Sequence, residues 1–141
     1  MDLKEEAILG ADIERHWYYR SKAAALCRLV AGLQPKRLLD VGAGSGFFSR
    51  HLLAATAAQS ALCVDTGYTD DRDDSIAGKP VYFRRDTGPT DCDLVLMMDV
   101  LEHVGDDRGL ARHYAAKVPS GAHFLVTVPA FAFLWSGHDV F

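Results

Sequence analysis

The sequence predicts an α/β fold with a parallel sheet of about five strands and helices on both faces. Three observations favour this class. Short apolar runs of strand length alternate along the chain with longer amphipathic or polar segments. The first of these runs breaks into a glycine-rich turn directly before a helical pattern. The length of 141 residues is typical of a single domain, so one sheet accounts for the chain.

The first half of the chain supplies a helical segment and two strands. Residues 12–33 carry apolar and aromatic side chains at roughly helical spacing and predict one or two helices that end near Gly32 and Pro35. The apolar run 37–41 predicts the first strand, and the helical pattern of 45–57 predicts the helix that leads back across the sheet. Residues 60–65 predict a second strand that ends in an acid.

The second half supplies three more strands and one helix. Residues 66–80 are rich in Asp, Gly, Thr and Ser, and they predict a short, irregular crossover without a helix. Further strands are expected at 81–83, 93–98 and 122–128, and an amphipathic helix at 107–118, which Pro119 and Gly121 stop.

Composition excludes several classes of protein. The chain is 49% hydrophobic and 24% charged, which is typical of a globular protein in water. Its net charge of −4 argues against a nucleic-acid partner, which requires a basic face. The acidic N-terminus lacks the apolar core of a signal peptide, and no run approaches the ~18 apolar residues of a membrane helix. We therefore expect a cytoplasmic protein with no membrane partner.

The three cysteines are Cys27, Cys63 and Cys92, and they stand far apart in or beside apolar segments. Their spacing matches neither a metal site nor a redox pair, so we expect reduced thiols and no metal.

The glycine motif is the first sign of a ligand site. Gly42, Gly44 and Gly46 follow the first strand and precede the helix. A dinucleotide-binding motif would place its third glycine one position later, where Phe47 stands. The spacing therefore favours a ligand without a pyrophosphate. The alternative is a tight turn that binds nothing.

Acidic residues follow the strands and add to this sign. Asp65 ends the second strand 23 residues after Gly42, close to the roughly 20 residues expected for an acid that binds a ribose. The Asp86-Thr87 pair follows the third strand, where an acid can accept a hydrogen bond from the amine of an adenine. For Asp65 and Asp86 a simple turn residue is the alternative.

With Asp40 and Asp99, four acids are expected at the carboxyl edge of the sheet, where ligands of such folds bind. They suit a ligand with hydroxyls, an amine and a positive charge.

Together these motifs resemble the class I S-adenosylmethionine-dependent methyltransferases, in particular the branch that acts on small molecules. The resemblance rests on the run from Leu38 to Ser49, on Val64-Asp65, on Arg85-Asp86 and on the segment from Asp99 to Val104, and it extends over residues 14–139. It implies a Rossmann-like domain at 37–141 that binds S-adenosylmethionine, an N-terminal helical cap or lid at 1–36, and a small-molecule methyl acceptor.

The resemblance also implies a role for each site residue. Gly42, Gly44 and Gly46 would lie under the methionine and ribose. Asp40 would hold the methionine amine and Asp65 the ribose hydroxyls. Asp86 and the backbone of Thr87 would contact adenine, while Met98 and Asp99 would line the methionine end and face the transferred methyl group.

Asp99 and His103 are the candidate catalytic residues, with Glu102 and His138 as further candidates for a base. For His103 a local hydrogen bond at the start of a helix is the alternative. The cluster His16, Trp17–Tyr19 would form a lid or a wall for the acceptor, unless it simply packs in the core.

The chain departs from this family at its end. Members usually continue past the fifth strand with a helix and an antiparallel hairpin, whereas this sequence ends at Phe141. We expect a truncated domain whose fifth strand, at 122–128, presents an apolar edge, with a homodimer through that edge as the alternative. The alternatives in function are a non-catalytic binding domain, an inactive fragment and, disfavoured by the glycine spacing, an NAD-type oxidoreductase.

Overall fold

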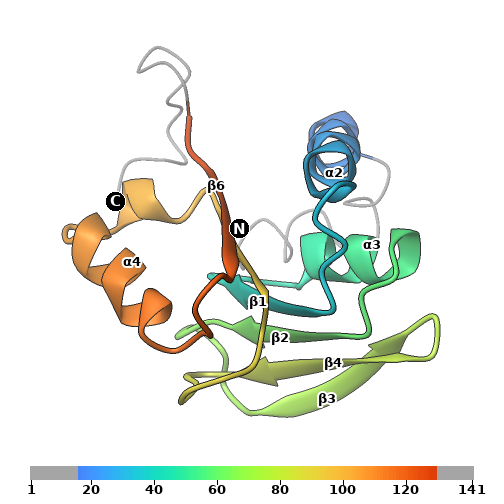
Figure 1. Cartoon of the computed structure of the whole chain (residues 1–141). Coiled ribbons are helices and arrows are strands. Elements are labelled where there is room, and N and C mark those ends of the chain that lie inside the picture. Colours follow the sequence, from blue (N-terminus) through green and yellow to red (C-terminus); the bar gives the residue numbers. More distant parts are fainter. Residues whose placement is uncertain (1–15, 130–141) are drawn as a thin grey trace.

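The computed structural model describes residues 16–129, which form a six-stranded sheet between two helical layers (Figure 1). The strand order across the sheet is β3-β4-β2-β1-β5-β6. The strands are β1 (Arg37–Val41), β2 (Ser60–Val64), β3 (Arg72–Ile76), β4 (Lys79–Arg84), β5 (Leu94–Met98) and β6 (His123–Thr127). The helices are α2 (Trp17–Val30), α3 (Phe47–Ala55), the 3₁₀ turn η2 (Leu101–His103) and α4 (Asp107–Ala115).

Helices cover both faces because the central strands are apolar on both faces. In β1, Leu38 faces the core formed by α2 and α3, whereas its neighbour Leu39 faces the core that contains Tyr114 of α4. This alternation is the two-residue period of a strand. α2 contributes its own buried stripe to the first core, with the spacing of a helix, through Tyr19, Ala23, Leu26 and Val30.

The five strands predicted from the sequence correspond to β1, β2, β4, β5 and β6, and all neighbouring pairs among them are parallel. The α/β class and the helices on both faces are therefore confirmed. The predicted helices at 45–57 and 107–118 are each shorter, at Phe47–Ala55 and Asp107–Ala115.

The sheet has one strand more than the five predicted, at one of its edges. A sixth strand, β3, lies within the segment 66–80 and pairs antiparallel with β4 through a two-residue turn at Ala77 and Gly78. β3 was not predicted because four of its five residues, Arg72 to Ser75, are polar and exposed. An exposed edge strand of this kind carries no apolar alternation.

The topology defines where a ligand would bind. The chain runs from β1 outward to β2 and β4, then returns to the other side of β1 to form β5 and β6. The order therefore reverses between β1 and β5, and in open α/β sheets the crevice at the carboxyl ends of such strands is the binding position. The glycine turn after β1 and Asp99 after β5 both lie at this point.

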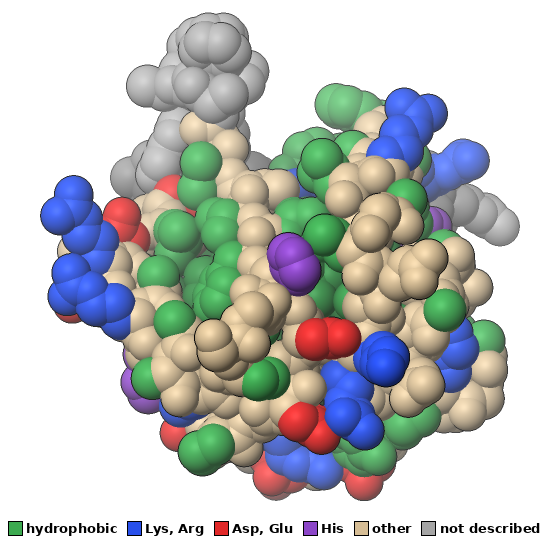
Figure 2. Space-filling view, in the orientation of Figure 1, with side chains coloured by type: hydrophobic (Ala, Val, Ile, Leu, Met, Phe, Trp, Pro, Cys, Tyr) green, Lys and Arg blue, Asp and Glu red, His purple; other side chains and the backbone are tan. Residues whose placement is uncertain are grey.

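The outer strand β6 has a partner on one side, β5, within residues 16–129. Figure 2 shows hydrophobic side chains around this strand. Phe124 is 38% exposed, Val126 43% and Val128 53%. Residues 130–141, which include His138, lie outside the described part of the chain. Within residues 16–129 no helix has both the length and the apolar character needed to cross a membrane.

Candidate functional site

The glycine turn is a tightly packed corner in which left-handed backbone is required. Gly42, Gly44 and Gly46 have φ angles of 66°, 54° and 73°, a region that glycine adopts without strain. A Cβ added at Gly42 would lie 2.7 Å from a methyl group of Val100, and one at Gly46 would lie 3.0 Å from the Phe83 ring. These glycines therefore allow the turn to pass directly against β4 and the loop after β5.

Asp65 lies against this turn, so the two strongest sequence motifs meet in space. Its carboxylate accepts hydrogen bonds from the Gly44 amide at 3.0 Å and from the Gly67 amide at 2.8 Å. The Tyr68 hydroxyl donates to the Gly44 carbonyl at 2.5 Å. Burial raises the pKa of Tyr68 well above its ordinary value, so this hydroxyl remains a donor at neutral pH. The turn and the loop after β2 are thus joined as one unit.

Ser45 gives the turn a polar group that has no partner within the described residues. Its hydroxyl oxygen is buried and makes no hydrogen bond. Buried hydroxyls are nearly always hydrogen-bonded in folded proteins, so the Ser45 hydroxyl is available to bond a ligand group at this turn.

Asp40 is placed differently from the other predicted acids. It lies within β1 rather than beyond its end, and its buried carboxylate accepts a 2.7 Å hydrogen bond from the Ser49 hydroxyl of α3. Burial raises the pKa of Asp40 to about 6, while the Ser49 bond opposes the shift and the nearby charge of Asp65 adds to it.

Asp99 is held by three residues from two elements, α2 and β6. The Lys22 ammonium and the Tyr18 hydroxyl, both from α2, contact Oδ2, the latter at 3.0 Å. The Thr127 hydroxyl, at the end of β6, donates to Oδ1 at 3.0 Å. Asp99 itself has a left-handed backbone, with φ 54°, directly after the buried Met98. Both carboxylate oxygens are therefore fixed in direction.

Asp86 and Thr87 lie in the loop after β4. Asp86 is exposed and forms an ion pair with Lys117 at 3.0 Å, and it accepts from the Thr87 amide at 2.7 Å. The hydrogen bond from Lys117 is the main reason that the pKa of Asp86 lies below its usual range.

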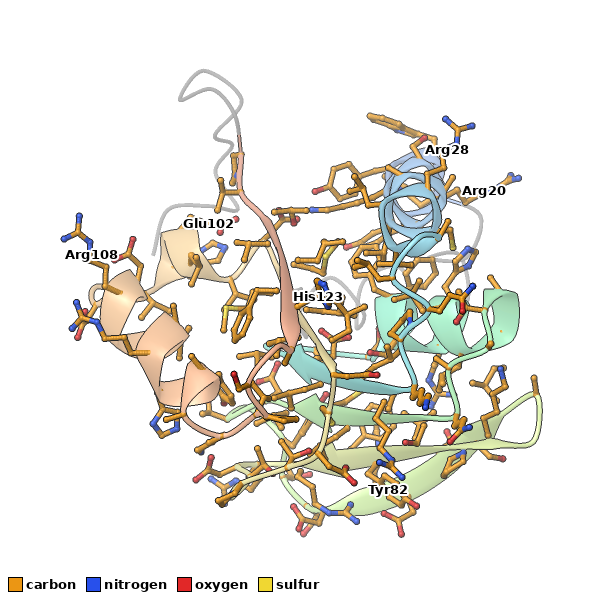
Figure 3. All side chains as sticks on the ribbon, in the orientation of Figure 1. Arg20, Arg28, Tyr82, Glu102, Arg108 and His123 are labelled. Atoms are coloured by element: carbon orange, nitrogen blue, oxygen red, sulfur yellow. The ribbon has the colours of Figure 1, made fainter. Side chains whose placement is uncertain are left out.

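Glu102 and His103 lie on η2, after β5, and have different surroundings. Glu102, labelled in Figure 3, has one buried carboxylate oxygen without a hydrogen-bond partner in the described residues. Burial, with a smaller contribution from Asp99, raises the pKa of Glu102. His103 is exposed. Of the two residues, Glu102 is therefore the more buried, and its pKa is raised by that burial.

Sequence reasoning missed several residues that shape the site, namely Lys22, Ser45, Tyr68, Lys117 and Thr127. Lys22 lies in α2 and Lys117 follows α4. No sequence motif specifies how these two helices are placed on the sheet. Tyr68 had a usable signal, since it stands three residues after Asp65 in a short loop.

Two other features bear on the chemistry. Within residues 16–129 no group of three His, Cys, Asp or Glu side chains is arranged to hold a metal ion. A hollow of about 200 Å³ lies at the opposite, amino-terminal ends of β5 and β6, beside Asp93 and the exposed His123 (Figure 3). Both oxygens of Asp93 accept hydrogen bonds from backbone amides there. Because the hollow lies at the opposite ends of the strands, it is separate from the site described above.

The strand order and the glycine turn at the point where it reverses define a Rossmann-like domain of the class I methyltransferase type. The sequence matches the methyltransferase domain family over residues 15–136, and the chain belongs to that family. The resemblance drawn from its motifs is therefore confirmed. No curated protein matches the sequence.

Two solved structures share this fold. An O-methyltransferase family protein from Burkholderia thailandensis is 17% identical, with a TM-score of 0.52 over 77% of this chain and 40% of that protein. The methyltransferase domain of bacterial CtHen1-CN is 20% identical, with a TM-score of 0.51 over 64% of this chain and 55% of that one. The chain thus matches 40% of the length of the first protein and 55% of the length of the second.

Proposed function

We propose that this chain binds S-adenosylmethionine and transfers its methyl group to a small-molecule acceptor. The observation that carries the proposal is the contact between Asp65 and the Gly44 amide. This contact joins an acid at the position expected to bind a ribose to a glycine turn whose spacing suits a ligand without phosphates. Both lie where the strand order of the sheet reverses. An adenosine ligand without phosphates suits this pair, whereas the acidic edge would repel a pyrophosphate.

The residues present suit the parts of that cofactor. Asp65 would accept from the ribose hydroxyls, and Asp86 with the Thr87 backbone would contact the adenine. The turn at Gly42, Gly44 and Gly46 would lie under the methionine portion, where the buried Ser45 hydroxyl lacks a partner. Met98 and Asp99 would line the methionine end, with Asp40 supporting the amine from below the turn.

When bound, the cofactor supplies a methyl group on a positively charged sulfur, which leaves as a neutral sulfide. The contribution required of the protein is therefore mainly positioning and charge. Asp99 would supply negative charge and would not act as a base, because Lys22, Tyr18 and Thr127 already bond to its two oxygens.

A base is required only for an acceptor that loses a proton. Glu102, whose raised pKa favours proton uptake, and the exposed His103 are the residues we propose for it. Because one solved relative is described as an O-methyltransferase family protein, hydroxyl compounds are the first acceptors to test.

Thermal unfolding with added ligands tests cofactor binding. S-adenosylhomocysteine should raise the melting temperature and NAD should not, because a ligand that binds only the folded state stabilises it. Asp65→Ala should remove most of this rise, whereas Asp70→Ala, which removes an exposed acid of the same loop, should leave it intact. No rise with millimolar S-adenosylhomocysteine would refute the proposed cofactor.

Transfer itself is tested with methyl-labelled S-adenosylmethionine and a panel of small hydroxyl compounds. The proposal predicts label in at least one product and loss of most of that label in Asp65→Ala. Firm cofactor binding without transfer to any compound of the panel would instead favour the non-catalytic binding domain.

A further inference from the structure

Lys22 is the cation that balances Asp99 at the carboxyl edge. Its ammonium forms an ion pair with Asp99 Oδ2 across 77 positions of sequence. It also lies 3.2 Å from the Tyr18 hydroxyl, 5.3 Å from the centre of the Tyr18 ring and 5.9 Å from that of Phe48. The ammonium is therefore enclosed by α2, by the first turn of α3 and by the loop after β5.

This pair is more sheltered than an ordinary surface ion pair. The Lys22 side chain is 15% exposed and that of Asp99 is 25% exposed. Charges in such a position are less screened by solvent than exposed ones, so removal of one of them changes the field at neighbouring atoms. The other basic residues of α2, Arg20 and Arg28, project away from the sheet (Figure 3) and carry no such partner among the described residues.

We propose that Lys22 is a specificity-determining residue, whose ion pair with Asp99 sets the relative affinity of the site for the charged cofactor and its uncharged product. The inference rests on the proposed function, in which Asp99 faces the sulfur of the cofactor. That sulfur is a cation in S-adenosylmethionine and neutral in S-adenosylhomocysteine, while the rest of the two molecules differs only by the methyl group.

The sign of the effect follows from the two charges. Asp99 alone favours a cation beside it, and Lys22 offsets that preference. Removal of the Lys22 charge should therefore increase the preference for S-adenosylmethionine over S-adenosylhomocysteine. Removal of the Asp99 charge leaves an unbalanced ammonium and should reduce the same preference.

Calorimetric titration of the full chain measures these affinities directly. The ligands are S-adenosylmethionine, S-adenosylhomocysteine and sinefungin, in which a protonated amine replaces the methylated sulfur. The proteins are wild type, Lys22→Met, Asp99→Asn and the double variant. Lys22→Arg retains the charge, and Arg28→Met removes an exposed charge from the same helix.

We expect Lys22→Met to raise the preference for the two cationic ligands over S-adenosylhomocysteine roughly five- to tenfold, the effect of one neighbouring charge in a partly sheltered site. Asp99→Asn should lower the preference by a similar factor, and the double variant should return close to wild type. Lys22→Arg and Arg28→Met should leave the ratio unchanged.

The outcomes separate this inference from the proposed function. If wild type binds none of the three ligands, the proposed cofactor is wrong. If wild type binds them but Lys22→Met changes all affinities by one common factor, Lys22 only tethers α2 and the inference is overturned. If Lys22→Met does not fold, the comparison of Asp99→Asn with Lys22→Arg decides, since only Asp99→Asn changes the net charge of the pair. An equal affinity ratio between S-adenosylmethionine and S-adenosylhomocysteine in these two variants would also overturn the inference.

Discussion

Asp40 is a carboxyl group buried in the central strand of the sheet, where its charge is unfavourable. Hydrogen bonds from the Ser49 hydroxyl and the Ser49 backbone do not offset burial, so the pKa of Asp40 rises to about 6 from the ordinary 3.8. The folded protein therefore favours the protonated carboxyl more than the unfolded chain does. The stability that this group contributes is fully present below pH 3.8 and is lost as the pH rises through about 6.

Asp40→Asn should remove this loss because an amide does not ionise. We expect the free energy of unfolding at pH 7.5 to rise by at most about 3 kcal/mol relative to wild type, with no gain near pH 4. Urea denaturation between pH 4 and 8 measures the difference. Asp70→Asn, at an exposed position, is the control, and wild-type and Asp40→Asn curves that run parallel across this range would contradict the assigned pKa.

Gly42 combines a left-handed backbone with a close neighbour, and the two effects can be measured separately. Gly42→Ala would incur the left-handed strain and place a methyl group 2.7 Å from Val100. Gly78→Ala would incur only the strain, because nothing lies within 4 Å of its added Cβ.

We expect Gly78→Ala to lower the free energy of unfolding by about 1 kcal/mol, and Gly42→Ala to lower it by a further ~1–3 kcal/mol from overpacking. Denaturant midpoints measure both variants. Val100→Ala added to Gly42→Ala should recover part of the stability lost through overpacking. Equal losses in Gly42→Ala and Gly78→Ala would show that the loop after β5 moves aside without cost.

The hairpin of β3 and β4 carries an unfavourable residue in its turn. Both turn residues have positive φ, 53° at Ala77 and 74° at Gly78, as in the type I′ turns that prefer Asn-Gly. Alanine is strained in this conformation and asparagine tolerates it.

Ala77→Asn should therefore raise the free energy of unfolding by about 0.5–1 kcal/mol. Thermal and urea unfolding measure this gain. Ala57→Asn is the control, because Ala57 is exposed and is not among the residues with positive φ. An Ala77→Asn variant no more stable than Ala57→Asn would show that the turn is not a fixed part of the hairpin.

The sequence predicted those elements in which the pattern of apolar and polar residues reflects their burial. β1 was predicted at its observed bounds, 37–41, because a strand buried on both faces reads as a continuous apolar run. β3 was not predicted because its residues are polar and exposed, a pattern that does not distinguish a strand from a loop. Its turn, Ala-Gly, also lacks the asparagine or aspartate that is typical of such hairpins.

The candidate site was predictable where its residues follow strands and not where helices bring in partners. Asp65 and the glycine turn meet because parallel strands end at one edge, a consequence of topology alone. The pairing of Asp99 with Lys22 depends on how α2 lies on the sheet. No local pattern encodes that placement, and Asp40 could not be told apart from the edge acids without knowing its depth.

The two edges of the sheet expose side chains of opposite character, charged at β3 and apolar at β6. β3 exposes Arg72, Asp73, Asp74 and Ser75, charged side chains of the kind that prevent edge strands from pairing with other chains. β6 instead exposes Phe124, Val126 and Val128 within and directly after the strand. An apolar edge strand is a site of association.

We propose that two copies of this chain pair through β6, since identical edges pair antiparallel with two-fold symmetry. Val126→Lys should then shift sedimentation velocity toward the monomer at concentrations where wild type forms a dimer. Ser75→Lys, on the β3 edge, should have no effect. Wild type that sediments as a monomer at all concentrations would refute this pairing.

The hydrogen bond from the Gly44 amide to Asp65 has a spectroscopic consequence. An amide proton that donates to a carboxylate resonates downfield of ordinary amides, so Gly44 should stand apart in a nitrogen–proton correlation spectrum. A sugar that engages the same carboxylate must weaken or redirect that bond. The Gly44 signal therefore gives the protein a built-in reporter of site occupancy that needs no attached probe and can be followed without any knowledge of the acceptor.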